Sequence, residues 1–234
     1  MSSDRFKNDS NKKNEQIANL RAQEQWNEAY KVYGRNRNEI KVDEWMDIFR
    51  DYIKACETPI IDLGCGSGNN TLYLVKKEKD VIPCDYSIVA MQNINNNFPE
   101  LKVTKQFDMT KGLPFEDNFT DLIIGDLSLH YFTETTTVDI INEIKRVLKP
   151  NGRLLYRVNS INDINYGAGQ GKEIEHHLYE TNDGKYKRFF DKDDILHFFN
   201  SSNWDVLYLQ EQTMERYGHK KVLFTGAVQI KKDG

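Results

Sequence analysis

Strand-like and helix-like segments alternate through the middle of the chain, and this alternation restricts the possible folds more than any other feature. Five short apolar segments have the length and composition of strands, at 59–63, 81–85, 101–108, 121–126 and 153–159. Three segments between them carry apolar residues at helical spacing, at 72–77, 88–98 and 138–148. This order predicts a parallel sheet with helices on both faces, a doubly wound three-layer α/β fold.

The last third of the chain departs from the alternation. Residues 160–172 are rich in Asn, Asp and Gly and are expected to form a long loop, and 177–190 read as a hairpin turning at 182–184. Two strands follow, at about 204–212 and 221–230, with too little sequence between them for a crossover helix. They must pair antiparallel, so we expect a mostly parallel seven-stranded sheet whose last strand is antiparallel.

The first 58 residues precede this sheet. Residues 1–16 contain almost no apolar side chains, and we expect a disordered tail there. Residues 17–58 are expected to form helices, because apolar residues recur at near-helical spacing up to Tyr33 and Asp43 can cap a second helix. The domain proper is then 59–234, with 160–190 as an insertion on its substrate side.

Composition excludes several classes of protein. The chain has 234 residues, a net charge of -4 and a pI of about 5.8, too balanced for a generic nucleic-acid binder. No apolar run reaches the roughly 18 residues of a membrane span, and the polar start does not resemble a signal peptide. Three cysteines imply no closed disulfide framework. We therefore expect a cytoplasmic protein, either a monomer or a homodimer.

A glycine-rich turn follows the first strand, at Gly64, Gly66 and Gly68. Such a turn, leading into a helix, brings bare backbone close to a ligand. The spacing differs from the dinucleotide fingerprint G-x-G-x-x-G, because Asn69 occupies the place of the last glycine. No Lys-Ser or Lys-Thr pair follows, so the segment is not a Walker phosphate loop either.

Aspartates stand at or near the ends of four predicted strands, at Asp62, Asp85, Asp108 and Asp126. In a doubly wound sheet these ends converge on one crevice. A pyrophosphate there would meet carboxylates without an obvious basic residue to offset them. A ligand with a sulfonium and an ammonium group would gain about 4 kcal/mol per charge pair at ~4 Å and intermediate dielectric.

Four segments taken together resemble the successive motifs of the class I S-adenosylmethionine-dependent methyltransferases: DLGCGSGNNTLYL, VIPCD, FDMTKGLPFEDNFTDLIIGD and EIKRVLKPNGRLLYRVNS. The resemblance covers residues 59–159, and the Rossmann-like fold that it implies extends to about residue 230. It implies S-adenosylmethionine as cofactor and S-adenosylhomocysteine as product. By this resemblance Gly64, Cys65, Gly66 and Gly68 surround the methionine portion of the cofactor, and Asp62 lies beneath its amino group.

The resemblance also assigns the adenosine side. Asp85 accepts hydrogen bonds from both ribose hydroxyls, and Tyr86 lies beside the ribose. Asp108 receives the adenine amino group while the Met109 backbone contacts the ring. Asp126 and Leu127 close the methionine end near the sulfonium.

A lid and a catalytic base are the less specific assignments. Trp26 and Tyr30 can form an amino-terminal lid over the cofactor, although core packing of an amphipathic helix explains them equally well. No catalytic residue is assigned firmly, since methyl transfer needs a base only when the nucleophile carries a proton of high pKa. Asp126, His130 and Tyr131 are the candidates, with ordinary packing as the alternative for the last two.

Four residues around the fifth strand are candidates for binding an acidic group of the substrate: Arg157, Asn159, Tyr166 and Arg188. The alternative is that they only face solvent at the rim of the site. A metal site is not expected. The chain has no C-x-x-C or H-x-x-x-H pair, and the adjacent His176 and His177 face opposite sides if they lie on a strand.

These features predict a methyltransferase that acts on a small molecule, because no extra domain or basic arm is available to hold a macromolecule. Three alternatives stay open: an RNA or protein methyltransferase, a non-catalytic cofactor-binding module, and an NAD-dependent oxidoreductase. The basic, Asn-rich segment 31–41 favours nucleic acid, and the glycine spacing speaks against NAD.

Overall fold

A seven-stranded sheet forms the centre of the computed structural model, which describes residues 2–216 and 218–231. Its spatial order is β3-β2-β1-β4-β5-β10-β9. The strands are β1 Ile60–Leu63, β2 Val81–Asp85, β3 Lys105–Gln106, β4 Thr120–Asp126, β5 Leu148–Asn159, β9 Trp204–Arg216 and β10 His219–Ile230. The first five pair in parallel, whereas β10 is antiparallel to both β5 and β9. The predicted mostly parallel sheet with an antiparallel last strand is confirmed.

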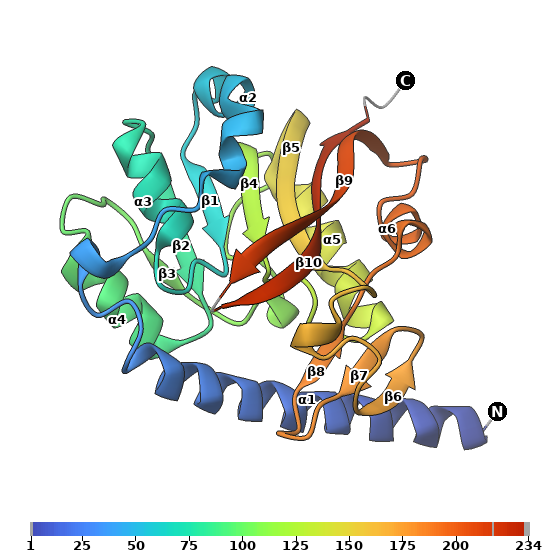
Figure 1. Cartoon of the computed structure of the whole chain (residues 1–234). Coiled ribbons are helices and arrows are strands. Elements are labelled where there is room, and N and C mark those ends of the chain that lie inside the picture. Colours follow the sequence, from blue (N-terminus) through green and yellow to red (C-terminus); the bar gives the residue numbers. More distant parts are fainter. Residues whose placement is uncertain (1, 217, 232–234) are drawn as a thin grey trace.

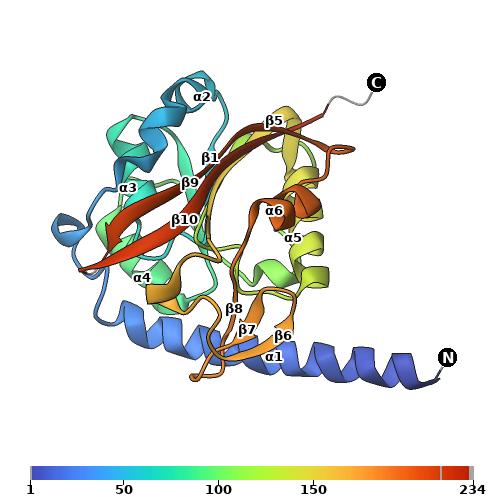
Figure 2. The ribbon, with the colours of Figure 1, turned by 45° about the vertical axis from the view of Figure 1, so that its right-hand side comes forward.

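Helices cover both faces of this sheet (Figures 1 and 2). They are α2 Arg50–Ala55, α3 Asn69–Lys76, α4 Ile88–Asn97, α5 Glu134–Val147 and α6 Lys192–Phe198. Successive residues of β1 face opposite sides of the sheet. Ile61 packs with buried residues of α5 and α6, and Ile60 packs with buried residues of α2 and α3. Every residue of β1 is buried, as expected for a strand covered on both sides.

A second, three-stranded antiparallel sheet follows β5. It consists of β6 Lys172–Glu175, β7 Leu178–Glu180 and β8 Tyr186–Arg188. The hairpin expected within 177–190 is present as β7 and β8, and its turn carries Gly184 at a φ of 76°. Four short 3₁₀ helices complete the described chain, at Arg37–Glu39, Glu44–Phe49, Met109–Lys111 and Ile164–Tyr166.

Two elements differ from the sequence prediction. Helix α1 spans Ser2–Tyr30, so residues 2–16 are helical where a disordered tail was expected. No Gly or Pro interrupts these residues, and the helix ends shortly before Gly34, whose φ is 71°. The third strand is shorter than expected, because only Lys105 and Gln106 pair with β2 at the edge of the sheet.

Helix α1 runs along the edge toward which β1 and β4 point, and the small sheet lies beside it (Figure 1). Its polar side chains tie it to that edge. Gln23 donates to the Tyr86 carbonyl at 3.0 Å, and Asn27 accepts from the Ser87 hydroxyl at 2.6 Å. Glu15 accepts from the Thr133 backbone N–H at 3.0 Å, at the start of α5. The helix is therefore docked over the carboxyl ends of the strands.

Candidate functional site: a glycine loop beneath an aromatic helix

The glycine-rich turn connects β1 to α3 and adopts a backbone that favours glycine. Gly64, Gly66 and Gly68 have φ values of 79°, 51° and 86°. A Cβ on Gly64 would lie 2.4 Å from Cβ of Ser128, just beyond β4, and one on Gly68 would lie 2.8 Å from Ile94. Close approach and positive φ thus require glycine, and the turn lies at the β1–β4 switch point of the sheet.

Asp85 holds this turn from the end of β2. One carboxylate oxygen accepts from the Gly66 N–H at 2.9 Å, and the other accepts from the Ser87 N–H at 2.8 Å. Burial raises the pKa of the carboxyl, although these backbone hydrogen bonds oppose the shift. The side chain thereby connects the glycine turn to the start of α4. The adjacent Tyr86 carbonyl receives Gln23 of α1.

Asp62 lies within β1 beneath the turn and is completely buried. It accepts from the Thr71 hydroxyl at 2.6 Å and from the Asn70 amide at 3.5 Å, both neutral donors of α3. Burial raises its pKa to about 7, and the nearby carboxylate of Asp126 adds to the shift. A cationic group bound next to Asp62 would stabilise its ionised form.

Asp126, at the end of β4, is tightly paired. Arg157 of β5 donates from Nε and Nη2 to the two carboxylate oxygens at 2.7 and 2.8 Å, and it also binds Asp43. Arg157, a candidate substrate ligand in the sequence, is buried and held between these two carboxylates. Because both Asp126 oxygens accept hydrogen bonds from Arg157, the Asp126 carboxylate is not a free base. Leu127 follows with a φ of 53°, an uncommon conformation for leucine.

Asp108 caps the 3₁₀ helix that begins at Met109. One of its carboxylate oxygens accepts from both the backbone and the hydroxyl of Thr110, at 3.0 and 2.7 Å. The other oxygen faces Lys111 at 3.7 Å. The residue thus has the capping role of an ordinary turn aspartate.

Aromatic side chains of α1 cover the glycine turn. A Cβ on Gly66 would lie 2.6 Å from the Tyr30 hydroxyl, so the ring reaches the turn. Trp26 stacks on Tyr30 with centroids 5.7 Å apart, and its edge meets Tyr131 at 5.9 Å. Helix α1 and the segment after β4 are thus joined by ring contacts beside the glycine turn. Cys65 lies buried in the same turn, and burial raises the pKa of its thiol.

His130 and Tyr131 follow β4. His130 is buried, and burial together with the positive charges of Lys187, Lys221 and Arg216 lowers its pKa well below the usual value. Burial raises the pKa of the Tyr131 hydroxyl. Both side chains are therefore neutral near pH 7, and neither is a strong base.

The remaining substrate candidates have different positions. Arg188 is buried and donates to the His176 carbonyl at 2.7 Å and to Glu175 at 2.8 Å, so it holds the small sheet together. Asn159 accepts from Lys221 at 2.7 Å, and the Tyr166 hydroxyl donates to the Arg216 carbonyl. Lys187 and Lys221, which both contact Tyr166, were not among the predicted site residues, since isolated lysines on separate strands give no local signal.

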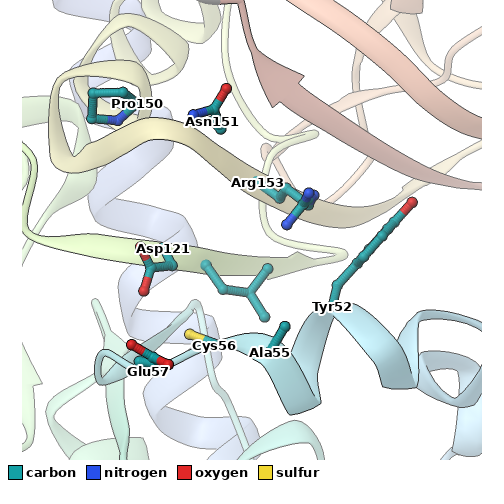
Figure 3. Close-up of a pocket in the computed structure, with 9 residues that line it drawn as sticks. Tyr52, Ala55, Cys56, Glu57, Asp121, Pro150, Asn151 and Arg153 are labelled. Atoms are coloured by element: carbon teal, nitrogen blue, oxygen red, sulfur yellow. The ribbon is translucent and has the colours of Figure 1, made fainter.

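A cavity of about 290 Å³ lies at the other edge of the sheet (Figure 3). It is bounded by the end of α2 and the starts of β4 and β5, where Asp121 and Arg153 face it. The Arg153 guanidinium lies 4.5 Å from the centre of the Tyr52 ring. Because Asp121 lies near the start of β4 and Asp126 ends it, this cavity is separate from the glycine turn.

One group of potential metal ligands joins the small sheet to α6. The donor atoms of His176, His177, Asp191 and Asp194 lie within 4.8 Å of one another. His177 hydrogen-bonds Asp194 at 2.7 Å, and Asp191 and Asp194 form the capping box of α6. These hydrogen bonds give the group a structural role, because they join the small sheet to α6.

Within residues 2–216 and 218–231, every helix is too short or too polar to cross a membrane.

Sheet order and turn together define a Rossmann-like α/β domain with its ligand crevice at the β1–β4 switch point. Residues 61–156 match the family described as "Methyltransferase domain". The matched residues make up about two fifths of the chain, and the match supports a class I S-adenosylmethionine-dependent methyltransferase domain there. The turn, where added Cβ atoms would clash, and the neighbouring carboxylates suit a ligand that combines a methionine-like cation with a ribose.

Known proteins with similar sequences or structures include several methyltransferases. The tRNA N(3)-cytidine methyltransferase METTL2 of Danio rerio is 27% identical over 160 residues, covering 63% of this chain and 45% of that protein. A methyltransferase structure from Methanosarcina mazei has a TM-score of 0.68 at 20% identity, covering 80% of this chain and 98% of that one.

A third similar protein is the 1,6-didemethyltoxoflavin-N1-methyltransferase of Burkholderia thailandensis, solved with its substrate and S-adenosylhomocysteine. It has a TM-score of 0.57 at 16% identity, covering 81% of this chain and 82% of that one. The chain spans less than half the length of the first curated relatives that it matches.

Proposed function

We propose that this protein transfers a methyl group from S-adenosylmethionine to a small-molecule acceptor. The observation that carries the proposal is the glycine turn at the switch point, pinned to Asp85 by the Gly66 N–H at 2.9 Å and flanked by Asp62. Carboxylates at one crevice suit a ligand that has both hydroxyl donors and positive charge. The family match of residues 61–156 supports the same conclusion.

The residues present define how the cofactor would be held. Gly64, Gly66 and Gly68, with Cys65 between them, would surround the methionine portion, and buried Asp62 would face its ammonium group. Asp85 and Tyr86 at the end of β2 would bind the ribose. Asp108 and Met109 would contact adenine, and Asp126 and Leu127 would close the end of the site near the sulfonium. The Trp26 and Tyr30 rings of α1 would exclude water from above.

When bound, S-adenosylmethionine supplies an electrophilic methyl carbon, onto which an acceptor lone pair bonds while the carbon–sulfur electron pair returns to sulfur. The chain's part is to align the acceptor and exclude water. Arg157 occupies Asp126 with two hydrogen bonds, and burial keeps His130 and Tyr131 neutral. None of the three is a ready general base, which favours an acceptor whose nucleophilic atom is already ionised or can react without first losing a proton of high pKa.

Two features favour a small acceptor. Helix α1 crosses the carboxyl edge of the sheet and packs rings on the glycine turn, leaving the site covered. The acidic pI of about 5.8 also gives little attraction for a polyanion. The small-molecule substrate of the Burkholderia protein is consistent with this reading, although that similarity extends to the fold alone.

RNA methylation is the second candidate, because METTL2 of Danio rerio is named for a tRNA substrate. Calorimetry with S-adenosylhomocysteine and with NAD tests the cofactor first. A screen with methyl-labelled cofactor then compares thiols, amines, carboxylates, phenols and metalloid oxyanions with bulk tRNA. We expect binding of S-adenosylhomocysteine but not NAD, and label on a small molecule; label on tRNA alone would refute the small-molecule assignment.

A further inference from the structure

Beside the glycine turn lies a second group of buried polar residues, at the ends of β4 and β5. Residues 188–190, at the end of β8 and just after it, connect its two central members: the Arg188 N–H donates to the His130 carbonyl, and the Phe190 N–H donates to the Asn159 carbonyl, each at 2.7 Å. His130 and Asn159 are 2% and 1% exposed. They are therefore placed side by side along one short segment, next to the proposed cofactor site.

Two polar atoms of this group lack a protein partner. Within the described part of the chain, neither His130 Nδ1 nor Asn159 Nδ2 makes a hydrogen bond, although both atoms are buried. A buried N–H without a partner costs about 1–3 kcal/mol, so such groups in folded proteins are normally satisfied by water or a ligand. Asn159 Nδ2 can only donate, and His130 Nδ1 donates in the tautomer that carries its proton there.

Positive charge surrounds the same two residues. Lys221 is buried and donates to Asn159 Oδ1 at 2.7 Å, and it pairs with Asp163 at 2.8 Å. Lys187 donates to the Tyr166 carbonyl at 2.6 Å, and Lys221 lies 4.5 Å from the centre of the Tyr166 ring. Both ammonium groups thus converge on one residue.

Lys187 and Lys221 both lie close enough to His130 to lower its pKa. Asp163 pairs with Lys221 at 2.8 Å, and Lys187 bonds to a neutral backbone carbonyl. Burial and the neighbouring Lys221 also lower the pKa of Lys187, to about 8. A bound anion would compensate the extra positive charge and would accept from the unpartnered donors.

We propose that the methyl acceptor carries an anionic group, a carboxylate, phosphate or similar oxyanion, bound by Lys187 and Lys221 with the buried donors of His130 and Asn159. This inference rests on the proposed function, because it gives the substrate class for that site. The anion belongs to a small molecule, since α1 and the small sheet enclose this side of the domain.

Binding of inorganic phosphate to the full chain, saturated with S-adenosylhomocysteine, tests the inference by calorimetry at constant ionic strength. Lys187→Met is the main variant, because Lys221→Met would strand the buried Asp163 and endanger the fold. Lys220→Met removes the same charge from an exposed neighbour on β10 and serves as the control. We expect phosphate binding to weaken about tenfold in Lys187→Met, with partial recovery in Lys187→Arg and no change in the control.

Each other outcome has a definite meaning. Failure of S-adenosylhomocysteine to bind the unaltered protein would overturn the proposed function itself. Normal binding of that ligand without phosphate binding, or equal weakening in Lys187→Met and Lys220→Met, would overturn the anion site alone. A short RNA that binds in a Lys187-dependent way while phosphate does not would also overturn it, because the acceptor would then be a nucleic acid.

Discussion

Asp62 provides a quantitative test of the cofactor site, because its burial couples ligand affinity to pH. Burial raises the pKa of this carboxyl to about 7 from an ordinary value of 3.8. An ammonium group next to it would restore the ionised form, so binding should release a proton below pH 7. With a bound-state pKa well below 5, the affinity for S-adenosylhomocysteine should increase about 30-fold, or about 2 kcal/mol, between about pH 5.5 and pH 8.

The same pKa shift makes the stability of the unliganded protein fall as the pH rises, whereas the ligand affinity increases. Since the folded-state pKa lies above the unfolded-state value, the Asp62 contribution to stability is fully present below about pH 4 and is lost as the pH rises through about 7. The shift of roughly three pH units corresponds to about 4 kcal/mol in the free energy of unfolding.

Asp62→Asn keeps the shape and can still accept from the Thr71 hydroxyl, so it is the matched variant. Calorimetry across this pH range, in two buffers of different ionisation enthalpy, measures both the affinity and the proton release. We expect the variant to bind about 30-fold more weakly at pH 8, with only the residual slope that Asp85 contributes. A flat affinity in the unaltered protein, or an equal slope in the variant, would refute the ammonium role of Asp62.

Three further variants test neighbouring contacts. Trp26→Ala removes two ring contacts and should weaken the binding of S-adenosylhomocysteine by about 1–2 kcal/mol, mainly because the ligand dissociates faster in stopped-flow experiments. An unchanged dissociation rate would argue against a lid. Glu15→Ala leaves the Thr133 N–H unpaired and should lower the free energy of unfolding in urea by about 1–3 kcal/mol, whereas deletion of residues 1–14 should not. Asp85→Ala should weaken the binding of S-adenosylhomocysteine by about 1.5–3 kcal/mol. Equal affinity in the variant and the unaltered protein would contradict the role of Asp85.

The sheet and its glycine turn could be predicted because each depends on local sequence pattern. Strand-helix alternation determines a parallel sheet, and a turn that needs positive φ at Gly64, Gly66 and Gly68 shows directly as glycine. The convergence of Asp62 and Asp85 on the turn then follows from topology, since parallel strands end at one edge.

Pairings between distant residues could not be predicted in this way. Arg157 was a reasonable substrate ligand in the sequence, because an arginine at a strand end has the same local appearance whether it binds a ligand or a carboxylate. Its partner Asp43 lies 114 residues earlier in the chain, and only the fold brings them together. The same reason hides Lys187 and Lys221, which meet at Tyr166 from separate strands.

Arg157 also explains how one crevice can hold ligands of opposite charge. The acidic residues Asp62 and Asp85 lie on β1 and β2, whereas Lys187 lies on β8 and Lys221 on β10. Between them, Arg157 is paired with both Asp126 and Asp43, so it does not compete with the lysines for an anion. In the proposed reaction the sulfonium loses its charge when its methyl group is transferred, whereas the anionic group of the acceptor stays bound to the lysines. A site that excludes water favours the loss of the sulfonium charge, because the cation then gives up less hydration than in solution. Separate acidic and basic halves would thus bind the two charged reactants without pairing their charges with one another.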